Sequence, residues 1–443
     1  MNFKRVLLSG LTALVLGFSA KEVNAATLKV SQSDNNTYSS IQSAIDTSID
    51  GDTVLVNPGT YSENIDFKGK NIVVKSSQGP QVTTIDGRKE VNPVVRFRNH
   101  ETNQAVLEGF AITGGIGNPP APTYGSEQGG GIYMGNAEPT IRGNIIRENG
   151  LARSTHPFTV WGGGIMCRSE GDFTKVYHPI IIGNIIKNNR AYHNGGGIGL
   201  LDAVAPYICD NVITENTTTL GDGGGIWSIP FHGDGTVIRK NIITKNFAED
   251  HGGGIYVGAK GPLLLDIDIS ENIIASNTAN SRANVGDSGG GIWSTSTYAS
   301  IRKNTIVKNI GNGGDGDYGG GISLYRWGSP TIEQNIIAYS SGGGIRCYLE
   351  ASPIIRNNLV WLNTPSDGTG SCLDWADKDG NFTSDPLFCN LVYGDYSLAE
   401  NSPALTNPIG TIGAISIPGC KSVPVIPVTW GTIKAMYRSR DIK

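Results

Sequence analysis

The sequence is short of charged residues, cysteine and long apolar runs. Asp, Glu, Lys and Arg make up only 17% of the 443 residues, and the formal net charge of −4 comes without any long basic run, which argues against a nucleic-acid-binding protein. The six cysteines are few for this length, and no Cys or His spacing matches a zinc site. Beyond the N-terminus, no apolar run is long enough for a membrane span. We therefore expect neither a nucleic-acid partner nor a transmembrane segment.

The N-terminus has the composition of a secretory signal. Lys4 and Arg5 precede an apolar stretch over residues 6–18, and a group of small residues ends at Ala25. We predict that residues 1–25 are a signal peptide, and that the mature protein is exported, soluble and located outside the cell, in the periplasm or at the cell surface.

Glycine is in excess, with 61 residues, which is about twice ordinary usage. The tetrapeptide Gly-Gly-Gly-Ile occurs eight times, with successive copies 33, 33, 28, 29, 37, 30 and 23 residues apart. The copies begin at Gly129, Gly162, Gly195, Gly223, Gly252, Gly289, Gly319 and Gly342. A constant core with a connecting segment of variable length indicates a repeated coil.

A second signature keeps step with the glycine triplets. It is an Asn that opens a short apolar run, as in Asn144-Ile-Ile and Asn241-Ile-Ile, and a third apolar piece such as Pro139-Thr-Ile lies between the two signatures. The eight opening residues are Asn144, Asn184, Asn211, Asn241, Asn272, Asn304, Asn335 and Asn358. Three short strands per coil are expected, with Gly and Asn at the turns and coils stacked about 4.8 Å apart. The Asn side chains are predicted to form a ladder inside one turn.

The two ends of the repeat region differ from it. Ile41, Ala44 and Ile45 recur at helical spacing after Ser39 or Ser40, so a short amphipathic helix is expected to cover the first coil. We predict a β-helix with its N-terminal cap over residues 26–365, a C-terminal capping module over residues 366–420 that shields the last edge, and a Pro-containing linker with a basic tail over residues 421–443. The tail is either a docking or sorting segment or a frayed terminus.

Two kinds of cysteine are expected in an exported protein. Cys389 and Cys420 are the favoured disulfide near the C-terminus. Cys167 and Cys347 each stand two residues after a repeated Ile, on the same side of the strand, and are predicted to be small core residues.

These motifs resemble the right-handed parallel β-helix proteins of the pectate-lyase-like superfamily, of the secreted bacterial type. Gly51-Asp-Thr-Val, the run from Pro58 to Glu63, Ile85-Asp-Gly and the two repeat signatures carry the resemblance over residues 38 to 363. It implies an all-β solenoid but not one activity, since lyases, hydrolases, epimerases and adhesins share this fold. The Trp-Ile-Asp-His segment of pectate lyases and the Arg-Ile-Lys of polygalacturonases are absent from the repeats, which argues against those two activities.

Aromatic residues are expected on the outer face of the strands that begin with the repeated Ile. Alternation places the residues one and three positions after the Ile outward, and Trp227, Tyr256 and Trp293 then lie on three consecutive coils. The predicted substrate-binding residues are Tyr133, Trp227, Tyr256, Trp293, Tyr325, Arg326, Arg346 and Tyr348. Exposed rings suit sugar faces and Arg suits carboxylates or sulfates. Alternatively, the connecting segments bury these rings in a second apolar cluster.

Acidic residues precede several triplets. The predicted catalytic residues are His251 as general base with Asp250, Asp287 and Asp317, and the predicted Ca²⁺ ligands are Asp222, Asp250, Asp287 and Asp317. Stacked carboxylates repel one another, which favours a cation between them. The glycine triplet has no side chains and is expected to form an unobstructed surface for a ligand between the acids and the rings. Alternatively, the acids cap turns and the histidine is solvated.

Two functions follow from these patterns. The first is a monomeric, secreted protein that binds an acidic polysaccharide, with lyase, epimerase or glycoside hydrolase chemistry as a hypothesis. The second is a non-catalytic surface or adhesion protein with a rigid β-helical rod. The repeats also resemble, more loosely, bacterial and chlamydial outer-surface proteins with Gly-Gly-Ala-Ile repeats.

Overall fold

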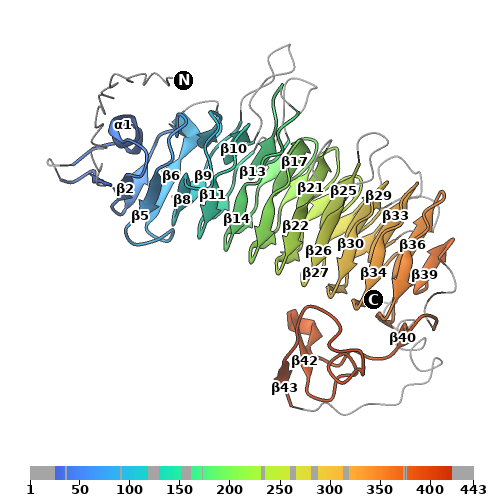
Figure 1. Cartoon of the computed structure of the whole chain (residues 1–443). Helices are drawn as coiled ribbons and strands as arrows, with labels where there is room; N and C mark the ends of the chain where they lie inside the picture. Colours follow the sequence, from blue (N-terminus) through green and yellow to red (C-terminus); the bar gives the residue numbers. More distant parts are fainter. Residues whose placement is uncertain are drawn as a thin grey trace, which may run out of the picture.

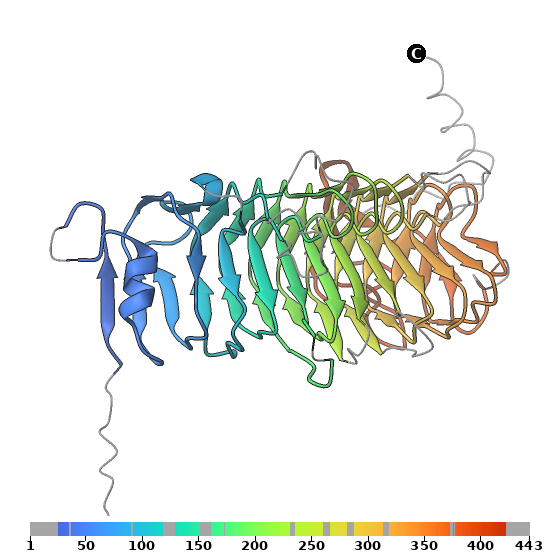
Figure 2. The ribbon, with the colours of Figure 1, turned by 90° about the horizontal axis from the view of Figure 1, so that it is seen from above.

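The computed structural model describes residues 25–34, 37–89, 92–117, 129–150, 161–171, 173–230, 235–259, 266–280, 288–312, 319–372, 375 and 377–421. In this part of the chain the backbone winds into an elongated stack of coils (Figures 1 and 2). Most coils contribute one strand to each of three long sheets, and the strands within each sheet are parallel. The predicted all-β parallel β-helix with three strands per coil is confirmed.

Within the described residues, sheet A contains twelve strands, which come from the third apolar segment of each repeat, often opened by Pro, and from its N-terminal counterparts. They are β1 (Thr27–Val30), β2 (Thr53–Val56), β5 (Val73–Ser76), β8 (Val106–Glu108), β11 (Thr140–Arg142), β14 (Ile180–Ile182), β18 (Tyr207–Cys209), β22 (Thr236–Arg239), β26 (Ile267–Ser270), β30 (Ser300–Arg302), β34 (Thr331–Glu333) and β37 (Ile354–Arg356).

Sheet B, as far as the structure describes the chain, contains twelve strands, most of which follow the ladder Asn. They are β3 (Gly59–Tyr61), β6 (Thr83–Asp86), β9 (Ala111–Thr113), β12 (Ile145–Arg147), β15 (Ile185–Lys187), β19 (Val212–Thr214), β23 (Ile242–Thr244), β27 (Ile273–Ala275), β31 (Thr305–Val307), β35 (Ile336–Ala338), β38 (Leu359–Trp361) and β40 (Phe382–Thr383).

In the described part of the chain, sheet C contains eleven strands, eight of which begin at the Ile of a Gly-Gly-Gly-Ile repeat. They are β4 (Ile65–Asp66), β7 (Val95–Phe97), β10 (Ile132–Gly135), β13 (Ile165–Arg168), β17 (Ile198–Asp202), β21 (Ile226–Pro230), β25 (Ile255–Gly258), β29 (Ile292–Thr295), β33 (Ile322–Tyr325), β36 (Ile345–Tyr348) and β39 (Gly368–Gly370). A shorter sheet D lies between sheets B and C in the chain and contains β16 (Arg190–Ala191), β20 (Thr217–Thr218), β24 (Phe247–Ala248), β28 (Thr278–Ala279) and β32 (Ile310–Gly311).

The repeated Ile residues form the interior of the solenoid. Ile226 pairs in register with Ile255, which pairs with Ile292, and all three side chains are buried. Equivalent positions of neighbouring coils therefore stack directly on one another, and each coil buries its apolar face against the next.

The predicted asparagine ladder is confirmed. Asn241 Nδ2 donates to Asn272 Oδ1 at 3.0 Å, and the same oxygen accepts the Asn241 backbone N–H at 2.9 Å. The Asn that closes each run forms a second ladder, because Asn246 makes the same two bonds to Asn277, each at 3.0 Å. The two ladders satisfy buried backbone groups where the chain turns, which is the reason these positions are Asn rather than Asp or Ser.

The positions of the triplets must be glycine because neighbouring backbone segments approach them closely, not because a ligand needs access there. A Cβ on Gly224 would lie 2.5 Å from the backbone carbonyl carbon of Phe247 in β24 and 2.6 Å from the carbonyl oxygen of Gly253. The triplets are buried between sheet D and the next coil. The expectation that they form an unobstructed surface for a ligand is wrong, since backbone atoms of sheet D and of the next coil already fill the space beside them.

The N-terminal helix is confirmed as α1 (Ile41–Thr47), with Ser40 as its N-cap. Ile41, Ala44 and Ile45 are buried in the same core cluster as the coils, and α1 lies at the N-terminal end of the stack (Figures 1 and 2). Short 3₁₀ helices occur at η1 (Gly87–Lys89) and η2 (Leu391–Tyr393).

The C-terminal module differs from the prediction. Strands β39 and β40 continue the coils to Thr383, and Asn381 extends the first Asn ladder. The remaining residues form a small sheet of β41 (Phe388–Asn390), β42 (Asp395–Ala399) and β43 (Pro418–Cys420) that packs on the outer side of sheet B (Figure 1). The solenoid thus ends later than residue 365, and residues 385–421 cover a lateral face rather than the last edge.

The cysteines confirm one prediction and correct another. Cys389 and Cys420 form the predicted disulfide within the C-terminal module. Cys347 is bonded to Cys372 and is therefore not a simple core residue, because the last coil brings Cys372 over it. Cys167 is a free, buried thiol as predicted.

Candidate functional site

One titratable cluster lies on the turn that leads into sheet C. His251 Nδ1 is 2.9 Å from Asp222 Oδ1 and 3.3 Å from Asp250 Oδ1, and all three side chains are partly buried. The same Asp222 oxygen accepts the backbone N–H of His251 at 3.0 Å, and Asn194 Oδ1 accepts the backbone N–H of Asp222 at 2.8 Å. Residues directly before successive triplets thus form a column of their own, with Asn194, Asp222 and His251 on adjacent coils.

This geometry has two chemical uses. A carboxylate against Nδ1 holds the ring proton there and places the basic lone pair of His251 on Nε2, which is the arrangement of an oriented general base. Alternatively, one donor atom from each of Asp222, Asp250 and His251 could ligate a divalent cation, since these atoms lie within 4.8 Å of one another. A ring nitrogen beside two carboxylates suits a transition-metal ion better than Ca²⁺, which prefers oxygen ligands.

The predicted line of acids is only partly described. Asp287 and Asp317 lie outside the described residues. Asp250 lies beside Asp222 and His251. The reason is that Asp222 directly precedes its triplet, and its side chain reaches the turn of the next coil, which contains Asp250 and His251. Sequence spacing paired Asp250 with later coils and did not show this contact.

The prediction of an exposed aromatic line is wrong for its first four members. Trp227, Tyr256 and Trp293 follow one another in register as expected, but they are only 3%, 7% and 5% exposed, and Tyr133 is fully buried. They form a second apolar cluster outside sheet C together with Met166, Leu201 and the partly buried Trp161, Ile229 and Tyr325. The alternative of a second cluster is therefore confirmed for these four rings.

Rings from neighbouring coils cover one another. Tyr256 and Trp293 stack with centroids 4.5 Å apart, and the ring of His251 lies 4.9 Å from that of Trp293. Trp161 reaches Trp227 at 5.7 Å, across a coil in which Gly199 has no side chain. Burial raises the pKa of Tyr256 well above its usual value, and the nearby Asp222 and Asp250 raise it further, so its hydroxyl stays neutral.

The ring stack becomes accessible toward the C-terminal end of sheet C. Trp293 stacks on Tyr325, and Tyr325 stacks on Tyr348, with centroids 5.7 Å apart in each pair. Tyr348 is 40% exposed, and Trp327, two residues after Tyr325, is 64% exposed. The indole Nε1 of Trp327 donates to Glu350 on the next coil.

Arginines flank this accessible part. The exposed Arg326 lies over the Tyr325 ring at 5.0 Å, whereas Arg346, over the Tyr348 ring at 5.1 Å, is only 6% exposed. Arg346 was predicted to bind substrate, but its side chain is buried and therefore does not present its guanidinium to solvent. We name Tyr325, Arg326, Trp327, Tyr348 and Glu350 the aromatic platform. Strand alternation did not assign Trp327, because it lies in a turn two positions after the outward Tyr325.

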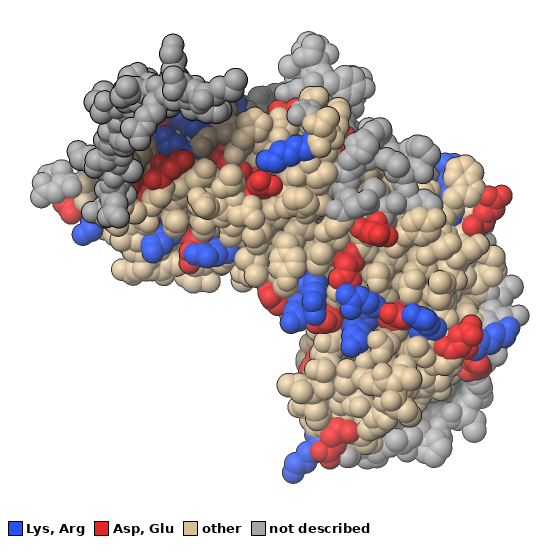
Figure 3. Space-filling view, viewed as in Figure 1, with Lys and Arg blue, Asp and Glu red and all other residues tan. Residues whose placement is uncertain are grey.

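Charged residues elsewhere form local pairs. Arg142 pairs with Glu108 at 2.7 Å and Arg302 with Asp268 at 3.1 Å, on the outer face of sheet A. Positive and negative side chains are interspersed on the face shown in Figure 3, as expected for a solvated surface without a single-sign patch.

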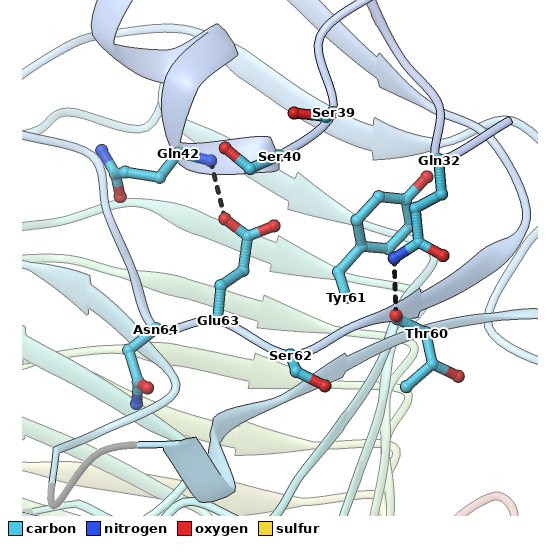
Figure 4. Close-up of a pocket in the computed structure, with 9 residues that line it drawn as sticks. All are labelled: Gln32, Ser39, Ser40, Gln42, Thr60, Tyr61, Ser62, Glu63 and Asn64. Atoms are coloured by element: carbon cyan, nitrogen blue, oxygen red, sulfur yellow. Dashed lines mark hydrogen bonds between the residues drawn. The ribbon is translucent and has the colours of Figure 1, made fainter. Parts of the chain in front are cut away.

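A polar hollow of about 510 Å³ lies beside α1 (Figure 4). Its polar groups already serve the fold, since the Glu63 carboxylate accepts the backbone N–H groups of Ile41 at 2.8 Å and of Gln42 at 3.0 Å. Gln32 Nε2 donates to the Thr60 carbonyl at 2.7 Å. We assign this hollow to the attachment of the helix.

Comparison with known proteins agrees with the architecture. Residues 67–274 match a protein-family model that is described as a right handed beta helix region. Together with the parallel sheets, this makes the chain a right-handed parallel β-helix repeat protein. None of the helices described is both long and apolar enough to cross a membrane.

Among the similar proteins are one curated sequence and one solved structure. Over 302 residues the chain is 26% identical to a cell surface glycoprotein of Methanothermus fervidus, covering 62% of this chain and 42% of that protein. The chain thus spans less than half the length of this relative. A solved structure, the A-module of the Azotobacter vinelandii mannuronan C-5 epimerase AlgE6, superposes with a TM-score of 0.37 at 16% identity, over 78% of this chain and 94% of that module. A similarity this distant has no bearing on activity.

Proposed function

We propose that the protein binds a polysaccharide outside the cell, at the aromatic platform on the C-terminal part of sheet C. The observation that carries this proposal is the exposed Trp327 beside the accessible end of a continuous ring stack. An indole that is 64% exposed and held in place by Glu350 presents an apolar face to solvent at little further ordering cost.

The chemistry of the platform suits sugars with acidic groups. Pyranose rings offer flat C–H faces that pack on Tyr and Trp, and their hydroxyls can bond to the carboxylate of Glu350. The guanidinium of Arg326 is exposed and can pair with a carboxylate or sulfate in a two-point geometry. A polymer can occupy several coils at once, because the coils repeat the same spacing along the axis.

An extracellular location is part of the proposal. The relative from Methanothermus fervidus is named a cell surface glycoprotein, and the two disulfides are typical of an oxidising compartment. The predicted signal peptide lies outside the described residues.

Replacing Trp327 and Tyr348 together by Ala is expected to weaken polysaccharide binding at least about tenfold, because each ring contact contributes about 0.5–1.5 kcal/mol beyond its buried area. Affinity electrophoresis against acidic and neutral polysaccharides would measure this. Tyr393→Ala is the matched control, since Tyr393 is 87% exposed on the C-terminal module, away from sheet C. Unchanged retention of the double variant on every glycan that the native protein binds would contradict the proposal.

A second candidate function is catalysis at Asp222, Asp250 and His251, favoured by the contact that orients the His251 ring. In a lyase or epimerase, His251 would take the proton beside a uronic carboxylate, and a cation such as Ca²⁺ held by Asp222 and Asp250 would neutralise that carboxylate. The partial burial of the cluster is the observation that disfavours a bulky substrate there.

If this chemistry occurs, His251→Ala is expected to lower product formation from a uronic-acid glycan by about a hundredfold or more. Unsaturated ends, reducing ends and epimerised sugars would be measured with and without Ca²⁺. His178→Ala, a change to a histidine that bonds to the Ala205 carbonyl, is the control. If the native protein gives no product from any glycan that it binds, the catalytic candidate is wrong and a non-catalytic surface protein remains.

A further inference from the structure

The outer face of sheet B carries a mostly aliphatic strip that the C-terminal module covers only in part. The strip consists of the residue that follows the ladder Asn in each coil, and these residues pair in register. Its members, in order along the stack, are Ile145, Ile185, Val212, Ile242, Ile273, Thr305, Ile336 and Leu359.

The two halves of this strip differ sharply in burial. Thr305, Ile336 and Leu359 are at most 1% exposed, because Leu398, Ala404 and Ile412 of the module pack over that end. In the other half, Ile185 is 37% and Ile242 is 42% exposed. A row of aliphatic side chains half open to water on five consecutive coils is unusual for a surface and indicates a binding face.

A groove of about 370 Å³ marks the boundary between the halves. Its floor is formed by Ile242 and Ile273 of the strip, and Tyr393 and Tyr396 of the module form its opposite wall. The groove is large enough for one aromatic side chain with part of its backbone and is continuous with the interface that the module already makes.

We propose that residues 422–437 of this chain dock on the open half of the strip, with Trp430 in the groove. This segment follows Lys421 directly and lies outside the described residues. Its apolar members are Val423, Val425, Ile426, Val428, Trp430, Ile433, Met436 and Tyr437. It therefore extends, along the chain, the apolar contact that residues 385–421 make with the other half of the same strip.

Because residues 422–437 are covalently connected to the module, they are favoured over a separate partner molecule as the ligand of the groove. Cys420 pairs with Ala399 of β42, which is two residues from Ser397, and Ser397 lines the groove. Lys421, the next residue, therefore leaves the module close to the groove. The nine peptide units between Lys421 and Trp430 reach up to about 30 Å when extended. A tether of this length gives an effective concentration in the millimolar range, so even a weak intrinsic affinity keeps the segment bound.

Cysteine cross-linking in the full chain tests the docking. The test pair is Thr244→Cys, at the rim of the groove, with Gly431→Cys, next to Trp430. The control pair is Ser300→Cys on the outer face of sheet A with the same Gly431→Cys. The native free thiols do not compete, because Cys167 and Cys209 are buried and burial raises the pKa of each.

We expect the test pair to form an intramolecular disulfide at least tenfold faster than the control pair, and Trp430→Ala to remove that difference. Equal rates for the two pairs, or no effect of Trp430→Ala, would overturn the proposal. A disulfide between two chains, detected by mass and light scattering, would also overturn it, because the strip would then be covered by a second copy.

Discussion

The substitution Asn246→Ala is expected to lower the free energy of unfolding by about 4 kcal/mol. Asn246 Nδ2 donates to the Ile213 carbonyl at 2.9 Å and to Asn277 Oδ1 at 3.0 Å, and its Oδ1 accepts the backbone N–H and the side-chain amide of Asn216, each at 3.0 Å. Alanine removes all four bonds inside a buried turn, and each buried polar group left without a partner costs about 1–3 kcal/mol.

Equilibrium unfolding in urea, followed by circular dichroism, would measure this change. Asn312→Ala is the matched control, since Asn312 Nδ2 donates to Asn280 Oδ1 at 3.2 Å at the exposed surface, and we expect an effect within about 0.5 kcal/mol. Equal losses for the two variants would show that the ladder is not a source of stability.

The largest effect is expected for Gly224→Ala, which should prevent accumulation of folded protein. The new Cβ would lie 2.5 Å from the carbonyl carbon and oxygen of Phe247 and 2.6 Å from the Gly253 oxygen. These are backbone atoms of β24 and of the next glycine triplet, so no side chain can rotate away and two coils would have to separate. Expression yield and the soluble fraction report the outcome directly.

Gly143→Asn is the control for the glycine prediction. Gly143 has φ of +62° and nothing within 4 Å of a Cβ, and Asn tolerates that backbone conformation. We expect this variant to fold with a loss of about 1 kcal/mol or less. A folded Gly224→Ala protein of near-native stability would refute the role assigned to the triplets.

The repeat pattern predicted most of the solenoid because each repeat uses the same local contacts. The Gly triplet, the buried Ile and the ladder Asn recur in fixed order, and parallel stacking brings each one onto its copy in the next coil. The end of the solenoid was predicted less well, since β39 and β40 pair with the coils without the triplet signature.

The candidate site was predicted only in part. Alternation along β21, β25 and β29 correctly assigned Trp227, Tyr256 and Trp293 to the outer face of sheet C. It could not show whether that face meets water, because burial there depends on stacking between coils and on residues such as Trp161 and His251 from the preceding turns. Trp327 was missed for a different reason: it lies in the turn after β33, where strand alternation no longer assigns an inner and an outer face.

The sequence by itself determined the β-helix, its register and the Asn ladder at the openings of the runs, because these depend on contacts between identical positions that repeat along the chain. Only the tertiary structure decided which outward residues are accessible, that Asp222 holds His251, and that the C-terminal module lies on sheet B. Those features depend on contacts between non-equivalent residues of different coils. Such contacts leave no periodic signal in the sequence, and the proposed functions depend on them.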